Sequence, residues 1–367
     1  MKQAAIYTAV AMSFAASAAL PALAQSNVTV YGILDTGLVH TTNTNAAGGA
    51  ATKMPALTGS VPSRLGFRGV EDLGGGLQAV FVLENGLGVD SGAAGQGGRL
   101  FGRQANIGLK GSWGALTLGR QVNMTFLSAL KSDVMGPNLF SMSSIDPYLP
   151  NARSDNAIGY LGTFKDVTVG ATYSFGRDAS AAGGAAATNC GGEVAGNAKA
   201  CRQMTALLGY DNKVYGVTAS YDIMYGNTGA AAGLTTSDSS DKRVTLNGYA
   251  MVGATRIGAG VMVRKKMAAT RANDLEADLY YAGASHPLTP ALTLDAQLAR
   301  HAVANSANDS TLAVLRLTYA LSKRTVVYSA VGHMHNSGTA ALALDAGGTV
   351  GAGLNQSGVL AGMRHAF

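Results

Sequence analysis

Six histidines are the side chains in this sequence best suited to acid–base or metal chemistry. They stand at His40, His286, His301, His333, His335 and His365. A hydrolase would need a Ser or Asp nucleophile or base beside one of them. His333 and His335 could share a strand face and bind a metal with a third ligand. The spacing in the sequence places neither a nucleophile or base nor a third metal ligand beside these histidines. The sequence therefore predicts no enzyme, no metal site and no cofactor.

The only cysteines, Cys190 and Cys201, lie close together in a stretch rich in Gly, Ala and Asn. Two ligands alone make a poor zinc site. In an exported chain, two cysteines this close favour a single disulfide that pins a loop. We therefore predict that this pair has a structural role.

The first 24 residues are typical of a cleaved secretory signal. Lys2 precedes an apolar run from Ala4 to Leu20, which Pro21 ends. The small residues of Ala22-Leu23-Ala24 then predict cleavage before Gln25. A membrane anchor is the alternative, but polar residues dilute the run. The mature chain, residues 25–367, is expected to form one domain.

The composition of the mature chain is unusual. Charged residues make up 13%, against roughly 25% in soluble domains. Without Lys2 the chain has 26 basic and 21 acidic residues, interleaved, which gives little support to a nucleic-acid partner. No stretch approaches the roughly 20 apolar residues of a membrane helix. Low charge with 49 glycines then favours a closed antiparallel β-barrel, the other structure that a bilayer permits.

Period-two alternation recurs in segments of about 9–11 residues, which is the signature of barrel strands. The sixteen segments are 28–39, 62–71, 77–88, 99–111, 114–121, 153–164, 166–176, 202–211, 214–224, 242–253, 256–266, 272–286, 290–303, 309–321, 325–336 and 357–367. Short connections alternate with mostly longer ones rich in small and polar residues. This segregation predicts short turns at one rim of a transmembrane barrel and long loops at the other.

Parity within these segments predicts which way the side chains face. Arg64, Arg68, Arg264 and Arg364 alternate with apolar residues, so they are expected to face the lumen. A charge on the lipid face at mid-depth costs roughly 2–4 kcal/mol, which supports this orientation. By the same rule, the aromatic residues expected to face inward are Tyr249 and Tyr280. Those expected near the short-turn rim, in an aromatic girdle, are Trp113, Tyr210, Tyr215, Tyr319 and Tyr328.

Several segments resemble the general diffusion porins of Gram-negative bacteria. They are Ser26–Asp35, Ser63–Leu77, Ile107–Gly111, Leu116–Arg120 and Gly362–Phe367. The resemblance covers essentially the whole mature chain and implies a homotrimer of 16-stranded barrels in the outer membrane. It also implies that Phe367 is read by the barrel-assembly machinery. Lipid, lipopolysaccharide, small hydrophilic solutes and inorganic ions are the other partners expected.

In that family the third external loop folds into the barrel opposite a cluster of arginines. The matching loop here is 122–152, with Asn138 where many members have Glu, and with Asp133 and Asp146 as its acids. The arginines that match by motif are Arg64, Arg120 and Arg153, and Lys110 is in phase with the lumen. Strict alternation turns Arg120 outward, so a bulge or the end of the strand must turn it inward.

These features predict a water-filled pore for passive diffusion with a weak to moderate preference for anions. Alternatively, some of the arginines only pair with Asp133 or Asp155 and hold the loop. A substrate-specific channel is a rival, although no aromatic track can be assembled from the sequence. A barrel enzyme with a site at the outer rim, near His40 or His301, is another, and a soluble or adhesive β-protein is the third.

Overall fold

A computed structural model describes residues 27–56, 58–178 and 188–367 of the chain. The expected signal segment and the cleavage site before Gln25 lie outside the described residues. One antiparallel sheet holds seventeen strands, and sixteen remain when the three-residue strand β2 is set aside. The strands are β1 Asn27–Thr41, β2 Ala51–Lys53, β3 Arg64–Gly74, β4 Leu77–Gly86, β5 Gln104–Gly111, β6 Gly114–Val122, β7 Arg153–Phe164, β8 Val167–Ser174, β9 Gln203–Asp211, β10 Tyr215–Tyr225, β11 Ser240–Val252, β12 Thr255–Met267, β13 Leu275–Pro287, β14 Leu292–Val303, β15 Ser310–Ala320, β16 Thr325–Asn336 and β17 Gln356–Ala366.

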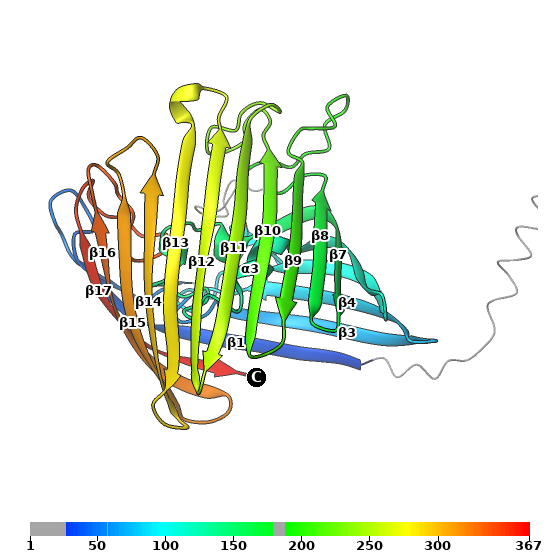
Figure 1. Ribbon diagram of the computed structural model, residues 1–367, viewed down its shortest axis with the longest axis horizontal. Coiled ribbons are helices and arrows are strands. Elements are labelled where there is room, and N and C mark those ends of the chain that lie inside the picture. Colours follow the sequence, from blue (N-terminus) through cyan, green and yellow to red (C-terminus); the bar gives the residue numbers. More distant parts are fainter. Residues whose placement is uncertain (1–26, 57, 179–187) are drawn as a thin grey trace, which may run out of the picture.

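The sheet closes on itself through β1. The first half of this strand, up to Ile33, pairs with β3, and the second half pairs with the last strand, β17. The main chain of Phe367 extends this pairing through two hydrogen bonds with Gly32, of 3.0 and 3.1 Å. Figure 1 shows the strands side by side around the resulting barrel. The closed sixteen-stranded antiparallel barrel confirms the predicted fold.

The two rims of the barrel differ, as predicted. Turns of two to four residues join the strand pairs at the lower rim of Figure 1, and the long loops lie at the upper rim. Each of the sixteen predicted segments overlaps one strand, whereas β2 and the helix α3 (Met124–Ala129) have no predicted counterpart. The other helical turns are α2 Gly95–Gly98, η1 Met142–Ser144, η2 Leu149–Asn151 and η4 Arg271–Asn273. None of the described helices is long and apolar enough to cross a membrane.

Side chains alternate between the two faces of the barrel wall. In β11, Val244 and Leu246 are exposed on the outside, whereas Arg243, Thr245 and Asn247 are buried on the inside. An apolar outer face and a polar inner face are what a bilayer-spanning barrel requires.

The same alternation decides the positions predicted from parity. Arg64, Arg68, Arg264 and Arg364 have the inward phase of their strands, as predicted. In the expected aromatic girdle, Tyr210, Tyr215 and Tyr319 are exposed near the short turns, and Trp113 lies in the turn after β5. Tyr249 lies on the inward face, with its hydroxyl 2.7 Å from Asp211.

Two predictions about tyrosines are wrong. Tyr280 is 47% exposed on the outer face, and its neighbour Tyr281 points inward instead. Tyr328 is buried inside the barrel, where its hydroxyl donates to Asp35 at 2.5 Å, so it is not part of a girdle. Both errors come from assuming that apolar and aromatic residues face lipid. Part of the inner wall is covered by loops, so it carries apolar side chains as well.

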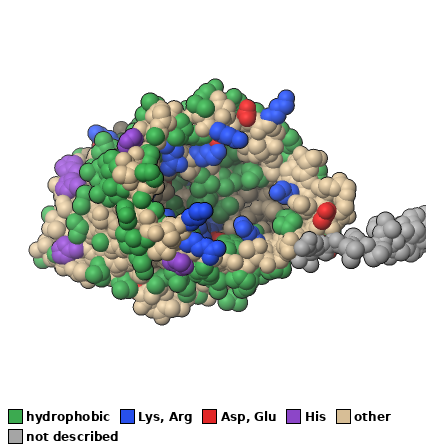
Figure 2. Space-filling model, turned by 90° about the horizontal axis from the view of Figure 1, so that it is seen from below, with side chains coloured by type: hydrophobic (Ala, Val, Ile, Leu, Met, Phe, Trp, Pro, Cys, Tyr) green, Lys and Arg blue, Asp and Glu red, His purple; other side chains and the backbone are tan. Residues whose placement is uncertain are grey.

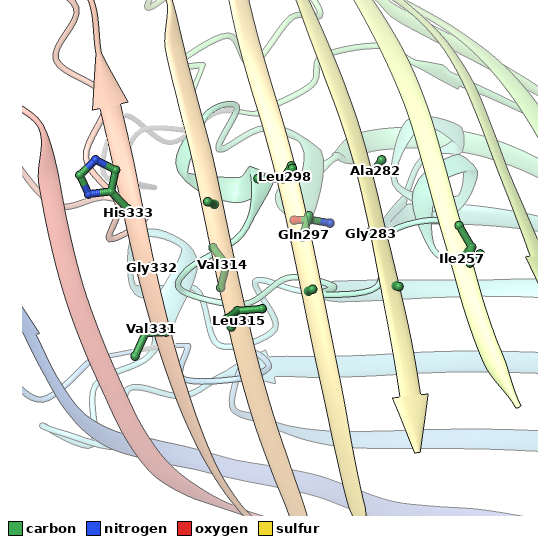
Figure 3. A pocket seen from close by; sticks show the side chains of 13 residues that line it. Ile257, Ala282, Gly283, Gln297, Leu298, Val314, Leu315, Val331, Gly332 and His333 are labelled. Atoms are coloured by element: carbon green, nitrogen blue, oxygen red, sulfur yellow. The ribbon is translucent and has the colours of Figure 1, made fainter. Parts of the chain in front are cut away.

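A shallow groove of about 620 Å³ crosses the outside of the barrel between β12 and β16 (Figure 3). Its outward side chains include Leu298, Leu315 and Val331, which are all exposed. Gln297 and Val314 also border the groove, but they alternate with these residues and are buried on the inner face. The groove therefore faces the membrane interior and lies outside any path through the barrel.

Cys190 and Cys201 form the predicted disulfide, with their Cα atoms 5.3 Å apart. The sulfur atoms are buried in a small cluster with Met224 of β10 and with Leu234 of the loop between β10 and β11. The bond therefore closes the loop between β8 and β9 on itself, and the apolar cluster packs it against the neighbouring loop.

Removing the disulfide is expected to loosen the loop and leave the pore intact. Closing a loop this short stabilises the ordered state by about 3 kcal/mol in the chain-entropy model. We expect the double variant Cys190→Ser, Cys201→Ser to be cut faster between β8 and β9 by an added protease. Conductance in a planar bilayer should be unchanged. Equal rates of cutting for the variant and the native protein would show that the cluster alone holds the loop.

Candidate functional site: the pore constriction

The long loop between β6 and β7, residues 123–152, lies inside the barrel. It opens with helix α3, which Asn123 caps by accepting from the main-chain N–H groups of Thr125 and Phe126. The helix contacts β9, β10 and β11, and it is seen behind β10 and β11 in Figure 1. This loop corresponds to the inward-folded third loop that the sequence predicts.

Polar contacts tie the loop to the inner wall along its whole length. They are Thr125 with Asp222 (2.6 Å), Ser132 with Tyr281 (2.6 Å), Gln297 with Asp133 (2.7 Å), Arg316 with the Met135 carbonyl (2.9 Å) and Arg243 with Asp146 (3.0 Å). The wall partners come from five strands, β10 to β15 without β12. The loop is therefore held as one side of the pore and not as a free external segment.

Apolar packing reinforces these contacts. Buried loop side chains meet buried inward side chains of the wall in one cluster. The loop contributes Met135, Leu139, Phe140, Met142, Ile145 and Leu149, and the wall contributes among others Leu279, Leu312, Val314, Met334 and Leu360. Burial of a side chain of this size stabilises by about 1.5–3 kcal/mol. Sequence reasoning missed this cluster because it reserves the inner face for polar groups.

Asp146 is buried in a network of charges on the wall. Arg243 donates to its carboxylate, and Arg264 lies 3.8 Å from the same oxygen. Both arginines also pair with Asp241, at 3.1 and 2.7 Å. Burial by itself would raise the pKa of Asp146, but the two guanidinium groups outweigh it and lower the pKa to about 2. Asp146 is therefore ionised and points away from the pore.

Tyr148 lies at the centre of the same network. Its ring lies between the guanidinium groups of Arg177 and Arg243, at 4.6 and 4.5 Å from the ring centroid. Its hydroxyl donates to Asp222 and accepts from Asn123. Burial and the Asp222 carboxylate raise the pKa of Tyr148 far above its usual value. The neutral ring and the charges around it fix the end of the loop.

Asp133, the other acid of the loop, is also buried against the wall. One carboxylate oxygen accepts from Gln297 and from the main chain of Met135. Burial raises the pKa of Asp133 to about 6 in spite of these hydrogen bonds. Both acids that the sequence places in the loop thus serve to hold it.

The raised pKa predicts the effect of replacing Asp133. An acid whose pKa is raised on folding stabilises the fold below its ordinary pKa near 4, and this contribution is lost as the pH rises through about 6. Asp133→Asn should therefore raise the free energy of unfolding at pH 7.5 by at most about 3 kcal/mol, and with it the unfolding temperature, and leave both unchanged at pH 4. Circular dichroism in detergent measures both. Asp146→Asn, which removes a low-pKa acid, is the control with the opposite sign at pH 7.5.

An arginine cluster lies on the wall formed by β3 to β7. Arg103 forms an ion pair with Glu84 at 2.7 Å, and Arg64 lies 3.7 Å from the other oxygen of Glu84. Arg153 donates to the main-chain carbonyl of Arg103 at 2.9 Å. Within the described part of the chain, no carboxylate forms an ion pair with Arg153, which is 2% exposed. The three guanidinium groups thus have one acid among them, Glu84, which pairs with two of them, and the group is net positive.

Arg120 has different contacts from Arg64 and Arg153, the other two arginines that match the family motif. A bulge interrupts the pairing of β6 with β7 between Gly119 and Gln121, and Gly119 has a φ of +114°. Beyond the bulge, Gln121 is buried and bonds to Thr117, which is inward. Arg120 instead donates to the Gly102 carbonyl at 2.7 Å and pairs with Asp155. The bulge adds a residue to β7, and Arg120 is neutralised by an acid beside the cluster.

The remaining predicted residues lie apart from the cluster. Lys110 has the inward phase of β5, six positions from Gln104, which pairs with Glu84. At roughly 3.3 Å a residue, this puts Lys110 about 20 Å along the strand, toward the short turns. Asn138 is 1% exposed, and its amide oxygen accepts from the main chain of Phe140. It therefore braces the loop.

Arg103, Glu84 and Arg243 are among the site residues that the sequence analysis missed. Arg103 lies in the predicted segment 99–111 in the phase of Ile107 and Leu109, so strict alternation turns it outward, but β5 begins only at Gln104. Arg243 could have been found, because it has the same phase in β11 as Tyr249, which was assigned to the lumen. Seen from the short-turn rim, Figure 2 shows Lys and Arg side chains around a hollow with hydrophobic side chains deeper inside.

Comparisons with known proteins agree with this architecture. The family model of the Gram-negative porins matches residues 8–339. The outer membrane porin protein 32 of Delftia acidovorans is 31% identical, over 94% of this chain and 95% of that protein. The solved structure of the anion-selective porin from Comamonas acidovorans has a TM-score of 0.78 at 25% identity, covering 94% of this chain and 100% of that one. The trimer form of OmpT from Vibrio cholerae is similar in fold alone, with a TM-score of 0.63 at 16% identity, covering 93% of this chain and 99% of that one. The chain belongs to the Gram-negative porin family and resides in the outer membrane.

Proposed function

We propose that this porin passes small hydrophilic solutes by passive diffusion and prefers anions. The observation that carries the proposal is the asymmetry of charge across the pore. Arg64, Arg103 and Arg153 lie together on the wall, where Glu84 pairs with the first two and no carboxylate of a described residue pairs with Arg153. On the other side, Arg243 pairs with Asp146 and Gln297 donates a hydrogen bond to Asp133, so wall residues occupy both acids of the loop. The similar porin from Comamonas acidovorans is described as anion-selective, which supports the same sign here.

The expected preference is moderate. A guanidinium group roughly 8 Å from a passing anion contributes about 0.5 kcal/mol at a water-like dielectric. With Glu84 opposing one of the three arginines, two net charges give about 1 kcal/mol, or roughly a fivefold preference. A narrow neck with a lower effective dielectric would increase this value.

The proposal includes export, assembly and partners. The segment 1–24 is removed on export, and the mature chain forms a homotrimer in contact with lipid and lipopolysaccharide. The trimer form of OmpT supports such an assembly. Phe367 serves the barrel-assembly machinery as its recognition signal. No chemical step is proposed, and within the described residues no three or more His, Cys, Asp or Glu side chains gather to hold a metal ion.

The test is conductance of the purified protein in a planar bilayer with a KCl gradient. We expect stepwise openings that close in threes and a reversal potential displaced toward that of chloride. Displacement toward the potassium potential would overturn the anion preference and leave a diffusion pore. A folded protein without conductance would overturn the proposed function altogether.

A further inference from the structure

The water-facing surface of the inward loop is apolar. Within residues 124–151, most side chains are buried, including both acids. The partly or fully exposed residues are Phe126, Leu127, Ala129, Leu130, Lys131, Gly136, Pro137, Pro147, Pro150 and Asn151. Only one of them, Lys131, is charged. The loop therefore presents hydrocarbon to the pore and no negative charge.

Three adjoining cavities follow this surface through the barrel. The outer one, of about 390 Å³, is lined among others by Arg103, Lys53 and Asp345, and the last two form an ion pair. It shares Pro137, Ser143 and Pro150 with a middle cavity of about 90 Å³. Arg103 in the outer cavity thus lies beside the apolar loop.

The middle cavity is mostly hydrocarbon. Phe126, Leu130, Met142 and Leu149 contribute to its lining. The one acid that borders it is Asp133, whose carboxylate accepts a hydrogen bond from Gln297. Its small volume suits an apolar group no larger than an aromatic ring or a short alkyl chain.

An inner cavity continues the path toward the short turns. It has a volume of about 400 Å³ and shares Leu130 with the middle cavity. Lys131, Lys165 and Lys213 line it, against the acids Asp166 and Asp211. A solute that leaves the apolar stretch therefore meets cationic groups again.

We propose that the pore favours organic anions that carry an aromatic or short aliphatic group over equally charged hydrophilic anions. The anionic head lies beside Arg103 while the apolar part contacts Phe126, Leu130 and the loop prolines. Removal of about 50 Å² of apolar surface from water favours occupancy by roughly five- to tenfold. The inference rests on the proposed anion preference, because the arginine cluster on the wall must hold the anionic head group.

The probes are benzenesulfonate and 2-hydroxyethanesulfonate, which carry the same permanent charge and differ in the apolar group. Each is measured against chloride in a planar bilayer by its reversal potential, corrected for its mobility in bulk water. We expect benzenesulfonate to be several times more permeant than 2-hydroxyethanesulfonate in the native protein, although it is the larger ion. Equal or lower permeability for benzenesulfonate overturns the inference.

Variants assign the effect to the loop. Leu130→Ser should reduce the ratio of the two permeabilities severalfold, and Leu130→Met should restore it. Leu288→Ser is the matched control, because Leu288 is also 48% exposed but lies in the turn after β13, outside the three cavities. An unchanged ratio in Leu130→Ser, with the barrel folded, also overturns the inference. The two proposals can fail separately. A reversal potential displaced toward that of potassium in the KCl gradient would overturn both the anion preference and this inference. A preference for chloride, with equal permeability for the two sulfonates, would overturn only this inference.

Discussion

The double variant Arg64→Gln, Arg153→Gln should lose most of the preference for chloride over potassium. It leaves Arg103 paired with Glu84, so the net charge of the cluster falls from +2 to zero. Two arginines at roughly 8 Å contribute about 1 kcal/mol, and the permeability ratio should fall about fivefold. The measurement is the reversal potential in a KCl gradient, repeated at low and high salt, because screening weakens the effect of accessible charges.

Lys110→Gln is the matched control for this variant. It removes one inward positive charge at the other end of β5, about 20 Å from the residue that pairs with Glu84. This distance exceeds the screening length in ordinary salt, so its effect on selectivity should be much smaller. An unchanged preference in the double variant would mean that the arginines hold the loop and do not filter ions. A larger effect from Lys110→Gln would move the filter toward the short turns.

Arg243→Met should have the largest effect on stability. The arginine pairs with Asp146 at 3.0 Å and with Asp241 at 3.1 Å, and both acids are buried. Removing it leaves Arg264 alone to compensate two carboxylates, which costs about 3–5 kcal/mol. The loop would lose its contact with the wall near Tyr148, so we also expect larger and noisier single-channel conductance. Thermal unfolding in detergent and bilayer recordings measure the two effects.

Arg256→Met tests whether the replacement of any inward arginine would destabilise the barrel as much as Arg243→Met. Arg256 has the inward phase of β12, as Arg264 does, but lies near the short turns and forms no ion pair with a described residue. It should change the unfolding temperature little. The double change Asp146→Asn, Arg243→Met should recover much of the lost stability, since it leaves Arg264 paired with Asp241 and no carboxylate of this network uncompensated. Equal destabilisation by both single variants would contradict the role assigned to Arg243.

The strand count and the segregation of turns were predictable because they depend on local pattern. A strand that spans a bilayer has lipid on one side and must alternate its side chains along its own length. β11 and β12 follow this rule, and the charged phase predicted for Arg264 is confirmed. The disulfide was equally accessible, because proximity in sequence left one partner for each cysteine.

Parity failed where the inner wall is covered by another part of the chain. Leu279 and Tyr281 point inward because the loop with Ser132 lies over them, so their side chains contact protein and not water. A pattern rule that assumes water on the inside assigns Tyr280 to the wrong face for this reason. The same coverage explains why Asp133 and Asp146 are anchors, since their partners Gln297 and Arg243 lie far away in sequence.

By itself, the sequence determined the class of the fold, the sixteen strands, the pairing of the cysteines and the residue types available to the pore. Those properties follow from alternation, composition and short spacing. The partners of the charges on the inner wall depend on the tertiary structure. It brought Arg103 to Arg153 and Glu84, and it turned the acids of the loop to the wall. The physical reason is that the pairing of a buried charge is settled by contacts between distant segments, which no local pattern records.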